Sequence, residues 1–188
     1  MFAPSRSIVR VIDWVLEERT DGRKVTCLTD RQFYDSMEGK RDTKMLEFGR
    51  LLTAVVTPFK ADGAIDYEAF GRLCEGLLEA GNDALVVTGT TGESPVLTRE
   101  ERVSLYREAV RTSRGKGKVI AGTGGYDTNE SIHLSQMAAE CGVHGLLQVA
   151  PYYNKPPQLG LIKHFTAIAE ATPLPNILYN VPSRTITN

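Results

Sequence analysis

The 188-residue sequence predicts a parallel α/β fold, and three observations lead to this prediction. From Leu51 onward, apolar runs of strand length alternate with amphipathic segments at a period of roughly 30 residues, the size of a βαβ unit. The apolar runs are nearly continuous, as is typical of strands that are buried on both faces of a sheet. A helix end, a glycine turn and a strand start occur together at Glu79–Val87 and again at Glu140–Leu147. Such alternation indicates a parallel sheet with helical connections.

Five strands and four connecting helices follow from this pattern. The expected strands are Leu51–Phe59, Ala84–Thr88, Lys118–Gly122, Gly145–Ala150 and Asn176–Val181. The expected helices span about residues 66–80, 98–113, 128–141 and 158–171. Residues suited to N-capping precede the first three helices: Asp66, Thr98 with Glu101, and Asp127 or Thr128 with Glu130 nearby. Glycines suited to a left-handed C-cap follow the same helices: Gly81, Gly115 and Gly142.

A sheet of this kind is either a closed (β/α)8 barrel or an open doubly wound sheet. Gly122–Gly125 (GTGG), after the third strand, is only part of a dinucleotide-binding fingerprint. Polar loops follow every strand from the second onward, which favours the barrel because barrel sites are assembled from several strand ends. Since a complete barrel needs eight units and about 250 residues, we expect the first five units of a TIM barrel at residues 45–188. Its outer strands would be unpaired hydrophobic edges, which predicts an unstable or insoluble isolated chain.

Residues 1–44 differ in kind from the rest of the chain and form a separate N-terminal extension. Five apolar residues fall on one helical face and predict an amphipathic helix: Ile8, Val11, Ile12, Val15 and Leu16. The following segment, Arg19–Lys44, is charged and carries no motif that we can name. Two interpretations stay open: a genuine arm or partner helix, or upstream sequence that was wrongly assigned before a true start at Met45.

The composition indicates a soluble globular protein, with 41% hydrophobic and 24% charged residues. A net charge of −1 gives no electrostatic reason to expect nucleic acid as a partner. No apolar run approaches the roughly 20 residues that cross a membrane. Cys27, Cys74 and Cys141 are odd in number and widely spaced, which favours a reduced, cytoplasmic setting.

On a parallel barrel, the carboxyl ends of all strands lie on one face. This brings polar residues around one mouth: Thr90, Thr91, Thr123, Tyr152, Tyr153, Tyr179, Asn180, Ser183 and Arg184. The loop Gly89–Glu93 (GTTGE) is suited to an anion such as a carboxylate, because it exposes backbone N–H groups. Threonine and tyrosine hydroxyls suit a proton relay, since each both donates and accepts. Arg184 offers a bidentate fork for a carboxylate or phosphate.

The sequence offers no obvious nucleophile or metal site. His133, His144 and His164 fall away from the strand ends and form no ligand pair. Lys155 and Lys163 lie outside the apolar strands, where desolvation would lower a lysine pKa most, and we expect them to be solvated.

Four motifs become specific in combination: Leu52–Phe59 (LTAVVTPF), Gly89–Glu93 (GTTGE), Tyr152–Pro156 (YYNKP) and Tyr179–Thr185 (YNVPSRT). Together they resemble the 4-hydroxy-tetrahydrodipicolinate synthases, or dihydrodipicolinate synthases, of the pyruvate-dependent aldolase family. The resemblance covers about residues 45–188. A second interpretation is a sister aldolase similar to N-acetylneuraminate lyase, but Arg184 favours the synthases, since the neuraminate lyases tend to lack this arginine.

The resemblance implies a TIM-barrel lyase of lysine and diaminopimelate biosynthesis. It would condense pyruvate with L-aspartate 4-semialdehyde through a lysine Schiff base, without a metal or organic cofactor, as a cytoplasmic homotetramer of tight dimers. Thr90 and Thr91 would bind the pyruvate carboxylate, and Arg184 the semialdehyde carboxylate. Thr90 would also link Tyr153, which enters the neighbouring subunit's site, and Tyr179, the acid or base nearest the imine.

The resemblance also raises two doubts about activity and control. The family's Schiff-base lysine lies roughly one β/α unit beyond Tyr179, so we expect these 188 residues to be a catalytically incomplete fragment. A non-catalytic partner that lends its tyrosine to a complete subunit is therefore a third interpretation. The family's allosteric lysine pocket is partly kept, in Ser94, Glu130 and Tyr152. Pro95, Arg99, Arg102 and Tyr126 replace its usual residues, and the added charge predicts weak or absent inhibition by lysine.

Overall fold

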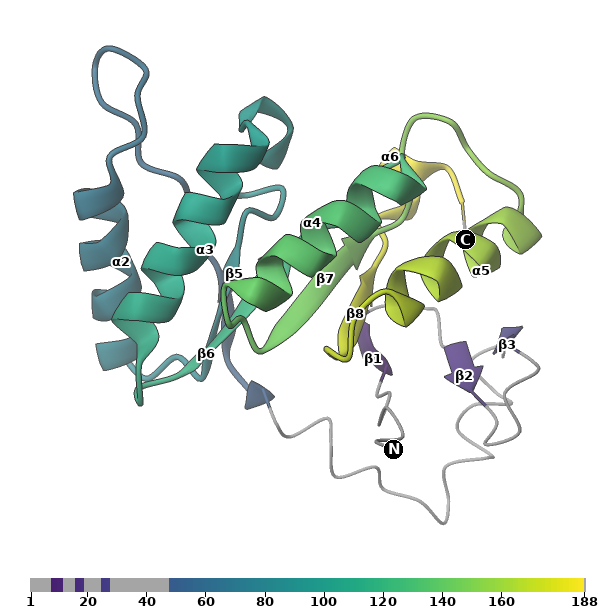
Figure 1. Cartoon of the computed structure of the whole chain (residues 1–188), viewed down its shortest axis with the longest axis horizontal. Coiled ribbons are helices and arrows are strands. Elements are labelled where there is room, and N and C mark those ends of the chain that lie inside the picture. Colours follow the sequence, from purple (N-terminus) through teal and green to yellow (C-terminus); the bar gives the residue numbers. More distant parts are fainter. Residues whose placement is uncertain (1–7, 12–15, 19–24, 28–47, 188) are drawn as a thin grey trace.

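A computed structural model describes residues 8–11, 16–18, 25–27 and 48–187 of the chain (Figure 1). Six parallel strands form its main sheet, in the order β1-β8-β7-β6-β5-β4. The strands are β1 (Ile8–Val11), β4 (Leu52–Ala54), β5 (Ala84–Val87), β6 (Lys118–Gly122), β7 (Gly145–Val149) and β8 (Asn176–Tyr179). The helices between them are α2 (Tyr67–Glu79), α3 (Arg99–Ser113), α4 (Thr128–Glu140) and α5 (Gln158–Glu170). The strands β4 to β8 with these helices form half of a TIM barrel, as predicted.

The helix ends follow the caps that the sequence indicates. The Asp66 carboxylate accepts the Ala69 N–H at 2.9 Å, and Asp127 accepts the Glu130 N–H at the same distance. At the start of α3, Thr98 and Glu101 form a reciprocal capping box. The glycines predicted to end the helices, Gly81, Gly115 and Gly142, all have positive φ. These local signals therefore place the helices to within one or two residues.

The first predicted strand is too long. Only Leu52–Ala54 pairs with β5, whereas Leu51–Phe59 was expected. Beyond Val55 the chain leaves the ladder, and Phe59 instead forms an antiparallel bridge with Ile65. Pro58 has no N–H to donate, so a regular ladder could not have continued through it to Phe59. Two short helices were not predicted: the 3-10 turn η2 (Ser94–Val96) and α6 (Pro182–Thr185).

The predicted N-terminal helix is wrong in the residues that the structure describes. Ile8–Val11 is β1, which pairs in parallel with β8, from Ile8 opposite Asn176 to Val11 opposite Tyr179. The residue Leu16 begins β2 (Leu16–Glu18), which pairs with β3 (Val25–Cys27); Ile12 and Val15 lie outside the described residues. The β-branched run of β1 favours a strand, and the edge of β8 offers unpaired backbone groups. Consequently β8 is not the bare edge that we expected.

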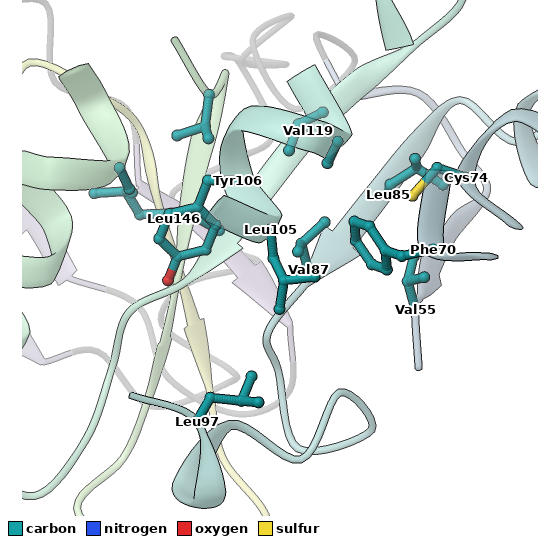
Figure 2. Close-up of a cluster of buried hydrophobic side chains, with 14 of the residues drawn as sticks. Val55, Phe70, Cys74, Leu85, Val87, Leu97, Leu105, Tyr106, Val119 and Leu146 are labelled. Atoms are coloured by element: carbon teal, nitrogen blue, oxygen red, sulfur yellow. The ribbon is translucent and has the colours of Figure 1, made fainter. Parts of the chain in front are cut away.

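The core lies on both faces of the sheet. On the helix side, one cluster contains Phe70 and Cys74 of α2, Leu105 and Tyr106 of α3, and Leu85 of β5; Figure 2 shows Leu85 beside Cys74 and Tyr106 beside Leu146. A second cluster joins Phe48, Val86, Ile120 and Ile177. Adjacent β5 residues therefore belong to different clusters, which explains the continuous apolar runs. In the described part of the chain, no helix is long and apolar enough to cross a membrane.

The pairing of β1 with β8 gives a test of the N-terminal segment. Deleting residues 1–44 removes β1, and backbone amides of β8 that face it lose their partners. We expect hydrogen exchange in Asn176–Tyr179 to become faster, while exchange in β6, which keeps both neighbours, stays the same. Hydrogen-exchange mass spectrometry on the full and shortened chains measures this difference, and equal protection of β8 would contradict the pairing.

Buried histidine makes stability depend on pH. The His164 side chain is buried, its Nδ1 lies 2.8 Å from the Thr128 hydroxyl, and burial lowers its pKa. The unfolded chain therefore binds a proton more readily than the folded chain. The contribution of neutral His164 to the free energy of unfolding is therefore fully present above the unfolded pKa of about 6.5, and it is lost as the pH falls below that value. The replacement His164→Gln should reduce this decline in urea unfolding between pH 5 and 8.

A matched control for this prediction is His133→Gln, at an exposed position on α4. Burial and Lys118 also lower the pKa of His144, which acts in the same direction and is kept in both variants. If His164→Gln and His133→Gln show the same pH slope, then His164 is not the group responsible.

Candidate active site

The carboxyl ends of β5 to β8 surround one cavity of about 770 Å³. Many of the residues singled out in the sequence line it, among them Thr90, Ser94, Glu130, Tyr152, Tyr179 and Arg184. They come from the loops after β5 and β7, from α4, from the end of β8 and from α6. The parallel topology therefore brings together residues that lie as far as 94 positions apart, from Thr90 to Arg184.

The loop Gly89–Glu93 forms a compact turn beside this cavity. The Gly92 and Glu93 N–H groups donate to the Gly89 and Thr90 carbonyls, each at 3.1 Å. In the segment that follows β4, the Thr57 hydroxyl donates to the Gly92 carbonyl at 2.8 Å. A Cβ atom at position 92 would lie only 3.0 Å from the Val55 carbonyl, so glycine fits this close approach.

The middle of this loop leaves backbone donors unused. Among the residues that the structure describes, the N–H groups of Thr90 and Thr91 have no hydrogen-bond acceptor. Both residues are exposed, and Thr90 lines the cavity whereas Thr91 does not. Adjacent free N–H groups in a fixed turn suit an anion, as the sequence suggested.

Tyr179 and Arg184 reach the cavity from the end of β8. Tyr179 is half-buried and pairs with Val149, while its carbonyl accepts the Ala150 N–H at 2.8 Å. Arg184 is exposed in α6, and within the described ranges its guanidinium forms no ion pair. Asn180, expected at the mouth, instead anchors α6 by accepting the Thr185 hydroxyl at 2.6 Å. Arg184 is thus a cation with a free fork on a fixed turn.

Thr123 lines the cavity, but its hydroxyl belongs to a buried polar network. Its Oγ1 lies 2.9 Å from the Ser135 hydroxyl and accepts the Gln148 amide N–H at 2.8 Å. The same Gln148 nitrogen also lies 3.1 Å from the Asn176 side-chain oxygen. This network joins β6, β7, β8 and α4 beneath the site. Sequence reasoning missed it, although a glutamine within an apolar strand was the available signal.

Three tyrosines lie together at the rim. Tyr126 contacts Tyr152 edge to face, with ring centroids 5.5 Å apart, and Tyr153 at 6.3 Å. Tyr126 and Tyr152 line the cavity, whereas Tyr153 does not and is 81% exposed. The structure therefore does not bring Tyr153 into the cavity with Thr90 and Tyr179 within one chain.

The residues expected to form an allosteric pocket, Ser94, Glu130 and Tyr152, line the same cavity, and two arginines contact two of them. Arg99 binds Glu130 through two hydrogen bonds, Nε to Oε1 at 3.2 Å and Nη2 to Oε2 at 2.5 Å. Arg102 lines the cavity and donates to the Ser94 carbonyl. The carboxylate of Glu130 is therefore already paired with a cation of its own chain.

Neither a buried lysine nor a metal-binding group is found in the part of the chain that the structure describes. Lys155 and Lys163 are exposed, as predicted, and Lys118 lies at the exposed start of β6. The described residues contain no group of three histidine, cysteine or acidic side chains that could hold a metal ion. His144 accepts the Val119 N–H at 3.1 Å, which is a structural contact.

Comparison with known proteins identifies the family. The model of the dihydrodipicolinate synthetase family matches residues 47–188. The 4-hydroxy-tetrahydrodipicolinate synthase of Symbiobacterium thermophilum is 59% identical over 144 residues, which are 77% of this chain and 49% of the relative. That of Nostoc sp. is 56% identical over 142 residues, 75% of this chain and 48% of the relative. The chain thus spans about half the length of the curated relatives that it matches.

Solved structures agree with this match. Dihydrodipicolinate synthase from Bacillus anthracis superposes with a TM-score of 0.74 at 52% identity, over 77% of this chain and 49% of that protein. The enzyme from Cyanidioschyzon merolae, solved with lysine bound, gives a TM-score of 0.74 at 49% identity, over 75% and 48%. The chain therefore belongs to the dihydrodipicolinate synthetase family.

Proposed function

We propose that this chain carries the substrate-binding half of a 4-hydroxy-tetrahydrodipicolinate synthase active site. The substrates would be pyruvate and L-aspartate 4-semialdehyde, as expected from the resemblance. The observation that carries the proposal is the single cavity lined by Thr90, Tyr179 and Arg184, which come from three separate segments. A carboxylate site, a hydroxyl and a guanidinium are the groups that two anionic substrates and a proton transfer require.

Each group has a role that its surroundings favour. The free N–H groups of Thr90 and Thr91 would bind the pyruvate carboxylate. The free guanidinium of Arg184 would bind the carboxylate of the semialdehyde and so select the aldehyde substrate. Tyr179, at the end of β8, would donate a proton to the oxygen that leaves as water, and Thr90 would link it to the relay.

The covalent step of the reaction requires a lysine amine, and none of the residues given a role above is a lysine. The amine would attack C2 of pyruvate and lose water to give an imine; loss of a C3 proton would then give the enamine that attacks the aldehyde. Such an amine needs a pKa lowered by burial, and the described lysines are exposed. We therefore expect the Schiff-base lysine to lie outside the residues that the structure describes.

In the assembled enzyme, a neighbouring subunit would supply the third hydroxyl of the proton relay. Tyr153 is 81% exposed and lies outside the cavity of its own chain, which leaves it free to enter the site of a neighbouring subunit. In this proposal the complete enzyme is a homotetramer of tight dimers, and the relay runs through Thr90, Tyr179 and the neighbour's tyrosine.

Pyruvate binding tests the proposal directly on this chain. In a ¹⁵N NMR titration, pyruvate should shift the amide signals of Thr90 and Thr91, because its carboxylate takes up their free N–H groups. Acetone, which has the ketone but no carboxylate, is the matched control and should leave both signals in place. Unchanged signals with pyruvate would remove the support for a carboxylate site.

Reduction with borohydride in the presence of pyruvate tests the expected lack of a nucleophile. Mass spectrometry should find no lysine adduct, because an exposed amine is protonated near neutral pH. An adduct trapped at Lys155, or at any other lysine of the chain, would show that these residues do contain the nucleophile.

Binding of L-lysine to the cavity should be weak or absent. Arg99 already pairs with Glu130, and Arg99 and Arg102 add positive charge where the ammonium of lysine would lie. Isothermal titration with millimolar L-lysine should detect no binding, and the double replacement Arg99→Ala with Arg102→Ala should increase it. Strong binding by the unmodified chain would contradict this prediction.

A further inference from the structure

A triangle of buried oxygen atoms lies directly beneath the Gly89–Glu93 loop. The Thr88 Oγ1 lies 3.0 Å from the Tyr106 hydroxyl oxygen and 3.0 Å from the Gly122 carbonyl oxygen. The Tyr106 hydroxyl donates to the same Gly122 carbonyl at 3.0 Å. Three segments meet here: the first residue after β5, the middle of α3 and the last residue of β6.

Thr88 has an unfavourable backbone conformation that needs support. Its φ of 55° lies in the left-handed region, which a β-branched residue rarely adopts. This conformation turns the chain out of β5 and into the Gly89–Glu93 loop. Residues in such regions persist only where the surrounding structure holds them. The side-chain oxygen of Thr88 is held on two sides, by Tyr106 and by Gly122.

Gly122 fits the same arrangement. A Cβ atom at this position would lie 2.5 Å from the Thr88 carbonyl oxygen, a distance that no side chain tolerates. The ends of β5 and β6 are therefore in close backbone contact. From the helix layer, the hydroxyl of Tyr106 contacts both strand ends, through the Thr88 side chain and the Gly122 carbonyl.

We propose that Tyr106 is a positioning residue for the Gly89–Glu93 loop. Its hydroxyl fixes Thr88 against Gly122 and thereby sets the direction of the Thr90 and Thr91 N–H groups. The inference rests on the proposed carboxylate site. Tyr106 is fully buried and is not among the cavity-lining residues, so it acts on a bound anion only through Thr88.

Electrostatics agree with a hydrogen-bonding role rather than a proton-transfer role. Burial raises the pKa of Tyr106 to about 12. The hydroxyl therefore keeps its proton at neutral pH and donates continuously. Figure 2 shows its ring among the apolar side chains of the core, which fix the ring independently of the hydroxyl. Removing only the hydroxyl thus separates positioning from packing.

The test is Tyr106→Phe, which keeps the ring, compared with Ser113→Ala. Ser113 is on the same helix, is also buried, and bonds only its own helix, so it controls for the loss of a buried hydroxyl. Hydrogen exchange of Gly92 and Glu93, whose N–H groups close the turn, should become about tenfold faster in Tyr106→Phe, the effect of losing one net hydrogen bond. Exchange in β7 serves as the reference for global stability.

A second pair of variants keeps the test decisive if Tyr106→Phe does not fold. The replacement Thr88→Val removes the hydroxyl at nearly the same shape, and Thr88→Ser keeps it. We expect Thr88→Val to loosen the turn as Tyr106→Phe does, and Thr88→Ser to behave like the unmodified chain. Pyruvate affinity, measured in the same titration, should fall severalfold in the two loosened variants.

The outcomes separate the two proposals. If the unmodified chain binds no pyruvate but Tyr106→Phe still loosens Gly92 and Glu93, then the positioning role stands and the carboxylate site fails. If neither Tyr106→Phe nor Thr88→Val changes the exchange of the turn relative to β7, the positioning role is overturned, whatever the affinity for pyruvate.

Discussion

Burial of the parallel sheet on both faces is the constraint on which the rest of this structure depends. Leu85 and Val87 pack in the helix-side cluster, while Val86 between them packs in the second cluster with Phe48. Strands buried in this way are joined by crossover helices that cover one face, and all strands then run in one direction. Their carboxyl ends collect at one edge, and the candidate site is the direct result of that topology.

The fold from β4 onward could be predicted because its signals are local. The capping pair Thr98 and Glu101 and the apolar run of β5 each act within a few residues. The sequence could not predict β1, because a strand forms there through pairing with β8, which lies more than 160 positions away. The buried role of Thr123 and the position of Tyr106 beneath the loop also escaped prediction, since both depend on contacts between separate β/α units.

Two kinds of polar group lie at the carboxyl edge of the sheet, and they differ in whether they are buried or exposed to solvent. Below the loops, Gln148 and Thr88 are buried and belong to hydrogen-bonded clusters that tie neighbouring strands together. Above them, Thr91, Tyr153 and Arg184 are exposed. Buried, bonded groups give a site its shape, because leaving one of them unpaired is costly. Exposed groups with free donors remain available to ligands or to another chain.

The pairing of β1 with β8 bears on how a barrel of this kind closes. A strand edge presents one row of N–H and C=O groups, which serves one neighbour at a time. β1 takes the place beside β8 that belongs to the next strand in the circular order of a barrel. Because the N-terminus leaves the ribosome first, Ile8–Val11 is available as soon as β8 has been made. In a barrel with a further strand, that strand would have to displace β1 from the edge of β8. Closure of the barrel would then be an exchange of strands and not the simple addition of one.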